Sequence, residues 1–559
     1  VDELKKGKSR VIESNHTLML GWNDKSLAII QQIALANESE GGGALVVLAD
    51  RDKEELEDLV RAAVESRENG LRLLGTQIIF RSGNPLAEHE LHKVAIETSR
   101  AVIALSPDGL DPDEADSRMV RQVLSLKGSD LKSHVVVEMQ DVDNRDLVNM
   151  IGGNMVEVIV AHDVIGRLMI QCARAPGLAH VLENMMGFEG AEFYLKNWPD
   201  LEGQTFMDIT CRFDEAIPIG IKTVDAEGKS EIVLNPPNNM VIKEGDEVMV
   251  LAEDDDSYDL NDGSYPVKAS EPQKRSKADI LSPEKMLFCG WRRDMSDMIM
   301  DLESSVAPGS ELWLFNTVPP GDRKALLLDK GNKEELALKN LELKQAVGNP
   351  IVRKDLMNIK EATTGESIAL DEFDSVLILA DSVAIDHGAD MESSDSRSLA
   401  SLLIIKDIQK RLRQERVERG ETPKETDPIS EILDTRTRSL LQVVECAGYV
   451  MSNQIVSAAI AQVAECRDLN AVLGELLSAR GNEPHIVPIT QYLDPENPKE
   501  NPCSFWDVCR LARLRNEVAI GYRPEEVEWA DSSKTILNPA NKAAPRTWHA
   551  KDELVVIAE

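Results

Sequence analysis

Several features that define common protein classes are scarce in this 559-residue sequence. Aromatic residues make up 4% of the chain, and 62 Lys and Arg stand against 98 Asp and Glu, a formal net charge of −36. That balance counts against a surface for nucleic acid or anionic lipid. Apolar runs such as Val376–Ala380 are far shorter than the roughly 18 to 20 residues of a membrane-spanning helix. We therefore expect a soluble chain that binds no nucleic acid.

Motifs for metals and catalysis are also missing. The seven cysteines form no Cys-x-x-Cys pair and have no zinc-type spacing with the nine histidines, and the odd count fits a reducing compartment. No phosphate-binding GxxxxGK[ST], GxSxG or HExxH pattern occurs. We therefore expect no enzymatic activity. The sequence starts at Val1 without an initiator methionine or a signal peptide, which indicates a fragment of a longer protein.

What the sequence does contain is a long internal repeat. Four short motifs recur in the same order in both halves: Gly21-Trp22 and Gly290-Trp291, Gly83-Asn84-Pro85 and Gly348-Asn349-Pro350, Asp116-Ser117-Arg118 and Asp395-Ser396-Arg397, Asn235-Pro236 and Asn538-Pro539. The separation between matching motifs mostly grows along the chain. This pattern indicates a duplicated unit of about 270 residues whose second copy carries insertions.

Within each copy, the hydrophobic pattern predicts an α/β fold. In the first copy, apolar runs at 17–20, 44–49, 77–81, 101–105 and 134–139 alternate with amphipathic stretches at helical spacing. Continuous apolar strands that alternate with helices are typical of a doubly wound parallel sheet, here Rossmann-like. After about residue 160 the pattern changes to a helix and then to short strands broken by Gly and Pro. We therefore expect two tandem Rossmann-like domains, each followed by a small α+β lobe.

These patterns set the expected domain boundaries. We place the first Rossmann-like domain at 16–160, a helical crossover with the first small lobe at 161–253, a polar linker at 254–284, the second Rossmann-like domain at 285–465 with an insertion at about 410–430, and the second small lobe at 466–559. Residues 163–186 and 434–465 are each expected to form one long helix.

A nicotinamide dinucleotide is not expected to bind. The turn after the first strand, Gly21-Trp22-Asn23-Asp24-Lys25-Ser26, keeps only the first glycine of the GxGxxG pattern that lets a pyrophosphate approach the backbone. The turn that begins Gly290-Trp291 in the second copy does the same. Asp50, at the end of the second strand, is the best remaining argument for a ribose-binding acid. An NAD(P)-binding, oxidoreductase-like protein therefore stays as the alternative function.

Particular motifs carry a resemblance to a known family. Tandem Rossmann-like units, each with a lobe that contains Asn-Pro and then an Asp-Glu ending (Asn235-Pro236 and Gly245–Leu251 in the first copy), resemble the regulator-of-potassium-conductance (RCK) domains that form gating rings beneath cation channels. The segments Gly21-Trp22-Asn23-Asp24, Leu48-Ala49-Asp50-Arg51-Asp52 and Arg81-Ser82-Gly83-Asn84-Pro85 resemble the plant CASTOR and POLLUX family of nuclear-envelope cation channels.

The resemblance implies a regulatory role within a larger assembly. In that family a transmembrane pore precedes this region, so residues 1–15 are expected to be the linker from the pore. Two RCK domains per subunit are expected to form a ring of eight in a homotetramer, with long helices exchanged between the two sheet domains. The resemblance further implies a location at the nuclear envelope and a role in the calcium oscillations of root symbiosis signalling.

Acidic side chains follow the predicted strands and are the candidate calcium ligands. They are Asp50 and Asp52 after the second strand, Asp108, Asp111, Asp113, Glu114 and Asp116 after the fourth, and Asp381, Asp386 and Asp390 in the matching loop of the second copy. Calcium takes six to eight oxygen ligands, and open α/β sheets bind ligands at this end of their strands.

Two interpretations of the first acidic loop stay open, because neither loop has the order of an EF-hand. Asp113, Glu114 and Asp116 equally suit a helix N-terminus, where negative charge is stabilising by roughly 0.3–1 kcal/mol. The run Glu253-Asp254-Asp255-Asp256 lies in the linker, where a solvated charge run is the expectation.

Overall fold

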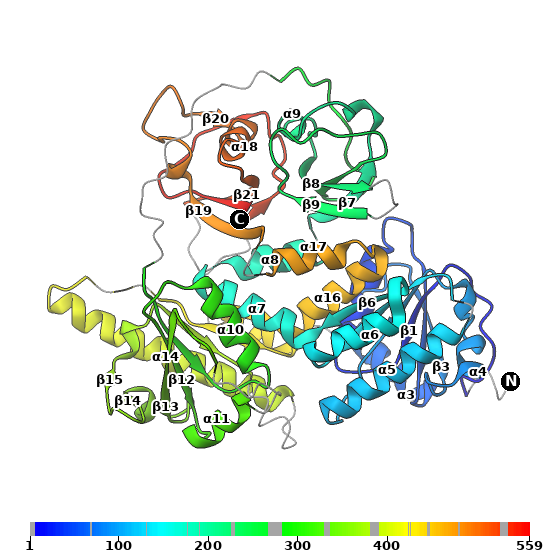
Figure 1. Cartoon of the computed structure of the whole chain (residues 1–559), viewed down its shortest axis with the longest axis horizontal. Helices are drawn as coiled ribbons and strands as arrows, with labels where there is room; N and C mark the ends of the chain where they lie inside the picture. The colour runs from blue at the N-terminus through cyan, green and yellow to red at the C-terminus, as the bar shows by residue number, and fades with distance from the viewer. Residues whose placement is uncertain are drawn as a thin grey trace. The chain divides into compact units, whose positions relative to one another are not determined.

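The computed structural model describes residues 6–66, 70–129, 131–175, 177–188, 190–224, 230–265, 282–328, 336–380, 391–422, 424, 426–443, 448–478, 481–525 and 535–559. Its contacts divide the chain into two compact units. The first unit contains Val1–Ile165, Glu183–Phe193 and Asn453–Gly474, and the second contains Gly166–Leu182, Tyr194–Ser452 and Glu475–Glu559. Each unit thus includes segments from both halves of the sequence (Figure 1).

The first unit contains a six-stranded parallel sheet in the order β3-β2-β1-β4-β5-β6. Its strands are β1 (Thr17–Leu20), β2 (Ala44–Ala49), β3 (Gln77–Ser82), β4 (Ala101–Ala104), β5 (His134–Met139) and β6 (Val156–Val160). They alternate with helices α2 (Ser26–Ala36), α3 (Lys53–Glu65), α4 (Glu88–Lys93), α5 (Pro112–Gly128) and α6 (Arg145–Gly152). The central strands are buried along their length because helices cover both faces, which explains their unbroken apolar sequences.

The second unit repeats this sheet in the order β13-β12-β11-β16-β17-β18. Its strands are β11 (Lys285–Cys289), β12 (Ser310–Asn316), β13 (Leu341–Val347), β16 (Ser375–Ile378), β17 (Ile429–Ile432) and β18 (Tyr449–Met451). Its helices are α10 (Met295–Ser305), α11 (Pro320–Leu328), α12 (Arg353–Leu356), α14 (Met391–Glu418) and α15 (Arg438–Val443), and β14 (Ile359–Lys360) pairs with β15 (Ser367–Ile368). The prediction of two Rossmann-like sheets is confirmed.

The two small lobes also share one topology. The first is β7 (Glu192–Asn197), α9 (Phe206–Ile209), β8 (Ala216–Val224), β9 (Ser230–Leu234) and β10 (Glu247–Ala252), in the sheet order β7-β10-β8-β9. The second is β19 (Glu483–Pro488), α18 (Phe505–Arg513), β21 (Val518–Arg523), β22 (Ile536–Leu537) and β24 (Glu553–Ala558), in the order β19-β24-β21-β22. A short pair, β20 (Cys503–Ser504) and β23 (Pro545–Arg546), is added to the second.

Backbone geometry confirms the internal repeat at the matched motifs. Gly21 and Gly290 have φ of +98° and +109°, and a Cβ at either would press on a carbonyl oxygen, at 3.2 Å from Leu105 and 2.8 Å from Leu379. A side chain is therefore strained at both positions. The asparagines of the Asn-Pro motifs, Asn235 and Asn538, likewise share a left-handed backbone, with φ of 44° and 43°.

The long helices differ from the expectation. Residues 163–186 form two helices, α7 (Ala161–Arg174) and α8 (Leu178–Met186), separated at Gly177, whose φ of +90° ends a helical path. Residues 434–465 contain α15, then strand β18, and then α16 (Ser452–Glu465), followed by α17 (Leu469–Leu476). The three residues of β18 are too few to show the alternating pattern of a strand, so the sequence pattern predicted one continuous helix. The segment 410–430, predicted as an insertion, holds the end of α14 and the connection to β17.

Helix α16 belongs to the first unit from Asn453 onward, although its sequence lies in the second half. The carbonyl of Val463 lies 2.9 Å from Nε2 of His134 on β5, and Glu465 forms an ion pair of 2.6 Å with Arg100 next to β4. The orange helix lies beside the blue strands in Figure 1. This placement agrees with the helix exchange that the family resemblance implies.

Candidate functional site

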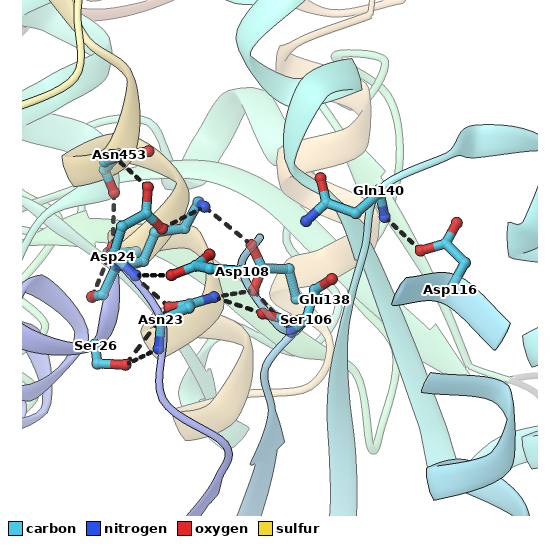
Figure 2. Close-up of polar contacts among 11 residues, drawn as sticks. Asn23, Asp24, Ser26, Ser106, Asp108, Asp116, Glu138, Gln140 and Asn453 are labelled. Atoms are coloured by element: carbon cyan, nitrogen blue, oxygen red, sulfur yellow. Dashed lines mark hydrogen bonds and ion pairs between the residues drawn. The ribbon is translucent and has the colours of Figure 1, made fainter. Parts of the chain in front are cut away.

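The loops after β1 and β4 meet at the carboxyl ends of the first sheet. The backbone N–H of Asp24 donates to Oδ2 of Asp108 at 2.8 Å, so the acidic loop is fastened to the start of α2 (Figure 2). Asn23 donates through Nδ2 to the Ser106 carbonyl at 3.1 Å and to Oε2 of Glu138 at 2.8 Å. We call the set Asn23, Asp24, Lys25, Asp108 and Glu138 the first mouth.

The first mouth has more acidic than basic side chains. Glu138 is 1% exposed at the end of β5, and its Oε1 lies 3.3 Å from Nζ of Lys25. The same ammonium donates to Oδ1 of Asp24 at 2.9 Å. Although burial alone would lower the pKa of Lys25, the carboxylates of Glu138 and Asp24 raise it, so Lys25 stays charged. One cation therefore faces three carboxyl groups.

Asp108 carries the consequence of this imbalance. Partial removal of its carboxyl from water, together with the nearby Asp24 carboxylate, raises the pKa of Asp108 to about 7, although Lys25 acts in the opposite direction. Near neutral pH the carboxyl group of Asp108 is therefore partly protonated. A bound cation would relieve the repulsion between Asp108 and Asp24 in the same way as a proton.

The remaining acids of the loop serve the start of α5. Asp111 is the N-cap residue, and its Oδ1 accepts from the N–H of Asp113 at 3.0 Å, with Pro112 at the first helical position. Asp113 and Glu114 lie in the first turn, and Glu114 forms an exposed ion pair with Arg118 at 2.9 Å. The helix-terminus interpretation thus has direct contacts, and the calcium interpretation stays a prediction.

Asp116 has a different environment. Its carboxylate, 1% exposed as a residue, accepts from the backbone N–H of Gln140 at 2.8 Å, from that of Asp141 at 3.0 Å and from Nδ2 of Asn144 at 2.8 Å. Burial raises the pKa of Asp116 even though these hydrogen bonds lower it. The matched Asp395 accepts from the N–H groups of Leu433 and Asp434 in the same way. Both aspartates fasten the loop after the fifth strand to the preceding helix.

The other predicted ligands lie apart from these contacts or outside the described residues. Asp50 and Asp52 are exposed after β2, and Asp52 is the N-cap residue of α3 without a side-chain hydrogen bond to that helix. Asp381, Asp386 and Asp390 fall outside the described residues. Among the residues the structure does describe, Asp254, Asp255 and Asp256 are a group of three whose carboxylate oxygens lie within 4.8 Å of one another.

The second sheet places a buried arginine between two carboxylates at the corresponding position. Arg292, 3% exposed, donates through Nε to Oδ1 of Asp294 at 2.9 Å and also binds Glu431, which is the penultimate residue of β17, as Glu138 is of β5. The two carboxylates raise the pKa of Arg292 although burial opposes them. The N–H of Ala380 donates to Glu431 at 2.9 Å, as Ser106 does to Glu138 at 3.1 Å. We call Arg292, Asp294 and Glu431 the second mouth.

Sequence reasoning missed the buried glutamates and their cationic partners. The available signal was a single acidic residue near the end of an otherwise apolar strand, in His134-Val135-Val136-Val137-Glu138-Met139 and again in Ile429-Ser430-Glu431-Ile432. A charge in such a strand needs a buried partner. The repeat would then have pointed to the turns that contain Lys25 and Arg292.

Comparisons with known proteins point to one family of channels. A family model described as "Castor and Pollux, part of voltage-gated ion channel" matches residues 162–268. The "Probable ion channel CASTOR" of Oryza sativa subsp. japonica is 46% identical, and the match covers 100% of this chain and 61% of that protein. "Ion channel CASTOR" of Lotus japonicus is 44% identical, with 100% and 64% covered. The chain thus spans about three fifths of the length of these relatives.

A solved structure shares the fold of this chain. The human SLO3 gating ring aligns over 97% of this chain and 98% of its own, with a TM-score of 0.61 and 12% sequence identity. At that identity the likeness concerns the fold alone. Of the helices that the structure describes, none combines the length and apolar character that crossing a bilayer requires.

Proposed function

The chain belongs to the Castor and Pollux family of ion channels, and we propose that it is the regulatory region of a cation channel that senses calcium. The observation that carries the proposal is the surplus of carboxylates at the first mouth. Asp24 and Asp108 lie together there, and the loop continues through Asp111, Asp113 and Glu114. Calcium prefers such oxygen ligands and tolerates flexible geometry.

The proposed mechanism is a ligand-dependent shift between two arrangements of the region. Calcium at Asp108 would relieve its repulsion with Asp24 and so favour the conformation in which the two loops stay together. A ligand shifts such an equilibrium only by its differential affinity for the two states. Asp116 is fully engaged by protein donors, so the proposed first site centres on Asp108, Asp111, Asp113 and Glu114. Asp50 and Asp52, and Asp381, Asp386 and Asp390, stay proposed ligands of further sites.

The wider assembly follows from the family and is part of the proposal. We propose that a pore precedes this region in the full protein and that four subunits form a ring of eight RCK domains. We also propose a nuclear-envelope location and a role in root symbiosis signalling for the full protein. We propose that the role is regulatory rather than catalytic and needs no nucleotide, and the hydrogen bonds that residues of the turn after β1 make within the chain support this.

Neutralising the loop tests the calcium site. The triple variant Asp108→Asn, Asp111→Asn, Asp113→Asn should lose at least one calcium-binding event in calorimetry, because three carboxylate ligands become neutral. The matched control is Glu54→Gln, Glu55→Gln, Asp58→Asn on α3, which removes the same charge from an exposed helix face and should keep the wild-type stoichiometry. Identical heat and stoichiometry in the triple variant and the wild type would remove this loop from the proposal.

Calcium binding at the first mouth is also expected to depend on pH. Because the pKa of Asp108 is raised to about 7, calcium must displace a proton from that carboxyl at lower pH. The affinity should therefore fall as pH drops from 8 through 7 to 6, and the Asp108→Asn variant should lose most of this dependence. Calorimetry at the three pH values measures it, and a wild-type affinity that is flat over the range would contradict the assignment.

A further inference from the structure

The structure assigns a coupling role to Ser452 and Asn453, two consecutive residues that each bind a different mouth. Ser452 belongs to the second unit and Asn453 to the first, so a single peptide bond joins the units at this point. We propose that this pair transmits a change in one charge cluster to the other. The inference extends the proposed regulatory function, because it names the residues through which regulation would pass.

Ser452 is anchored in the second mouth. It is fully buried at the first position of α16, directly after β18 ends at Met451, and its hydroxyl donates to Oε1 of Glu431 at 2.9 Å. Glu431 also binds Arg292 and accepts from the N–H of Ala380 at 2.9 Å. Ser452 is therefore part of the hydrogen-bond network that holds the ends of β16 and β17.

Asn453 is anchored in the first mouth. Its Nδ2 donates to Oδ2 of Asp24 at 3.1 Å, as Figure 2 shows, and the residue is 8% exposed. One turn later, the hydroxyl of Ser457 lies 3.4 Å from the carbonyl of Lys25. The carboxylate of Asp24 accepts a hydrogen bond from the Lys25 ammonium, and the backbone N–H of Asp24 donates to the carboxylate of Asp108. The start of α16 thus contacts Asp24 and Lys25, the two residues that interact with the acidic loop.

Helix α16 combines apolar packing with polar contacts, which farther along include those of Gln462 with the Met185 carbonyl and of Glu465 with Arg100. Residues farther along α16, such as Val456, Ile460 and Val463, are buried and apolar, as expected of a helix held by packing. Buried polar side chains need hydrogen-bond partners. Ser452 and Asn453 find theirs in the two charge clusters, which ties the beginning of the helix to both.

The coupling follows from the shortness of the connection. Adjacent Cα atoms are held 3.8 Å apart across a planar peptide, so a displacement of the Asn453 backbone acts directly on Ser452. Rearrangement of Asp24 would pull on Asn453 and thereby on the Ser452–Glu431 hydrogen bond. Such a contiguous chain of hydrogen bonds is a physical route for coupling between two sites.

Hydrogen exchange of the whole chain without calcium tests the proposal. In the wild-type background, Asp24→Ala should speed exchange roughly fivefold in two places. One is the peptide that covers β16 and the Ala380 amide, and the other is the peptide that covers β17. Fivefold is the factor that corresponds to one net hydrogen bond of about 1 kcal/mol. The Ser452→Ala and Asn453→Ala variants should each abolish that remote effect. The control Glu54→Ala changes an exposed acid in the first turn of α3 and should leave β16 and β17 unaffected.

Two results would overturn the inference. One is an Asp24→Ala effect confined to peptides of the first mouth, and the other is a remote effect that persists at full size in both Ser452→Ala and Asn453→Ala. Ser452→Ala removes one hydroxyl only, so it keeps the test valid if Asn453→Ala fails to fold. Because calcium is absent, failure here leaves calcium sensing untouched, and loss of calcium binding would leave this coupling intact.

Discussion

Replacing Arg292 with methionine is expected to lower the free energy of unfolding of the second unit by about 3–5 kcal/mol. Arg292 is 3% exposed and is the cation between Asp294 and Glu431, both of which are also buried. Methionine fills a similar volume but leaves two buried carboxylates without their cationic partner. Urea denaturation measures the change.

The control for this variant is Arg436→Met. Arg436 also pairs with an aspartate, Asp434, but its side chain is 76% exposed, so its loss should cost less than about 1 kcal/mol. The triple variant Arg292→Met, Asp294→Asn, Glu431→Gln, which also removes the two buried negative charges, should recover part of the stability. A cost below about 1 kcal/mol for Arg292→Met would contradict the description of Arg292 as the buried cation that holds the second mouth together.

Replacing Asp116 with alanine is expected to cost about 2–4 kcal/mol of unfolding free energy in the first unit, because two backbone N–H groups and the Asn144 amide lose their acceptor. The matched Asp395→Ala should destabilise the second unit by a similar amount, since Asp395 accepts from two backbone N–H groups and from Thr437. Thermal or chemical denaturation checks both.

Glu114→Ala is the matched control in the same helix. Its ion pair with Arg118 is exposed on both sides, so we expect a change of less than about 1 kcal/mol. If Asp116→Ala were as mild as Glu114→Ala, the aspartate would not be a structural residue of the loop after β5. In that case it would return to the set of proposed calcium ligands.

The sheet architecture could be predicted because its pattern is local and is repeated. Runs such as Ala44–Ala49 are apolar without a break, and the structure places β2 over those same residues. The repeat fixed the second copy from the first, down to Gly21 and Gly290, which share a positive φ. Strand β18 was missed because three residues carry too little periodicity. The sequence feature that indicated a break in the helical pattern was Gly448, where a Cβ would lie 2.3 Å from the Pro428 carbonyl oxygen.

The candidate site was harder to predict because its parts come from distant segments. The acidic loop was visible in the sequence, but its pairing with Asp24 depends on the register of β1 and β4. Asp116 looked like its neighbours in the loop, yet it alone is turned toward the backbone of Gln140 and Asp141. The contact of Asn453 with Asp24 joins residues 429 positions apart, which no local pattern reveals.

The most direct test of the central claim is calcium-dependent ion flux through the full-length channel reconstituted in lipid vesicles. If this region senses calcium at the first mouth, the triple variant Asp108→Asn, Asp111→Asn, Asp113→Asn should shift the midpoint of the calcium response at least about tenfold higher, the equivalent of about 1.4 kcal/mol. The α3 control variant, with the same loss of charge, should keep the wild-type midpoint. Equal midpoints in the wild type and the triple variant would contradict the account.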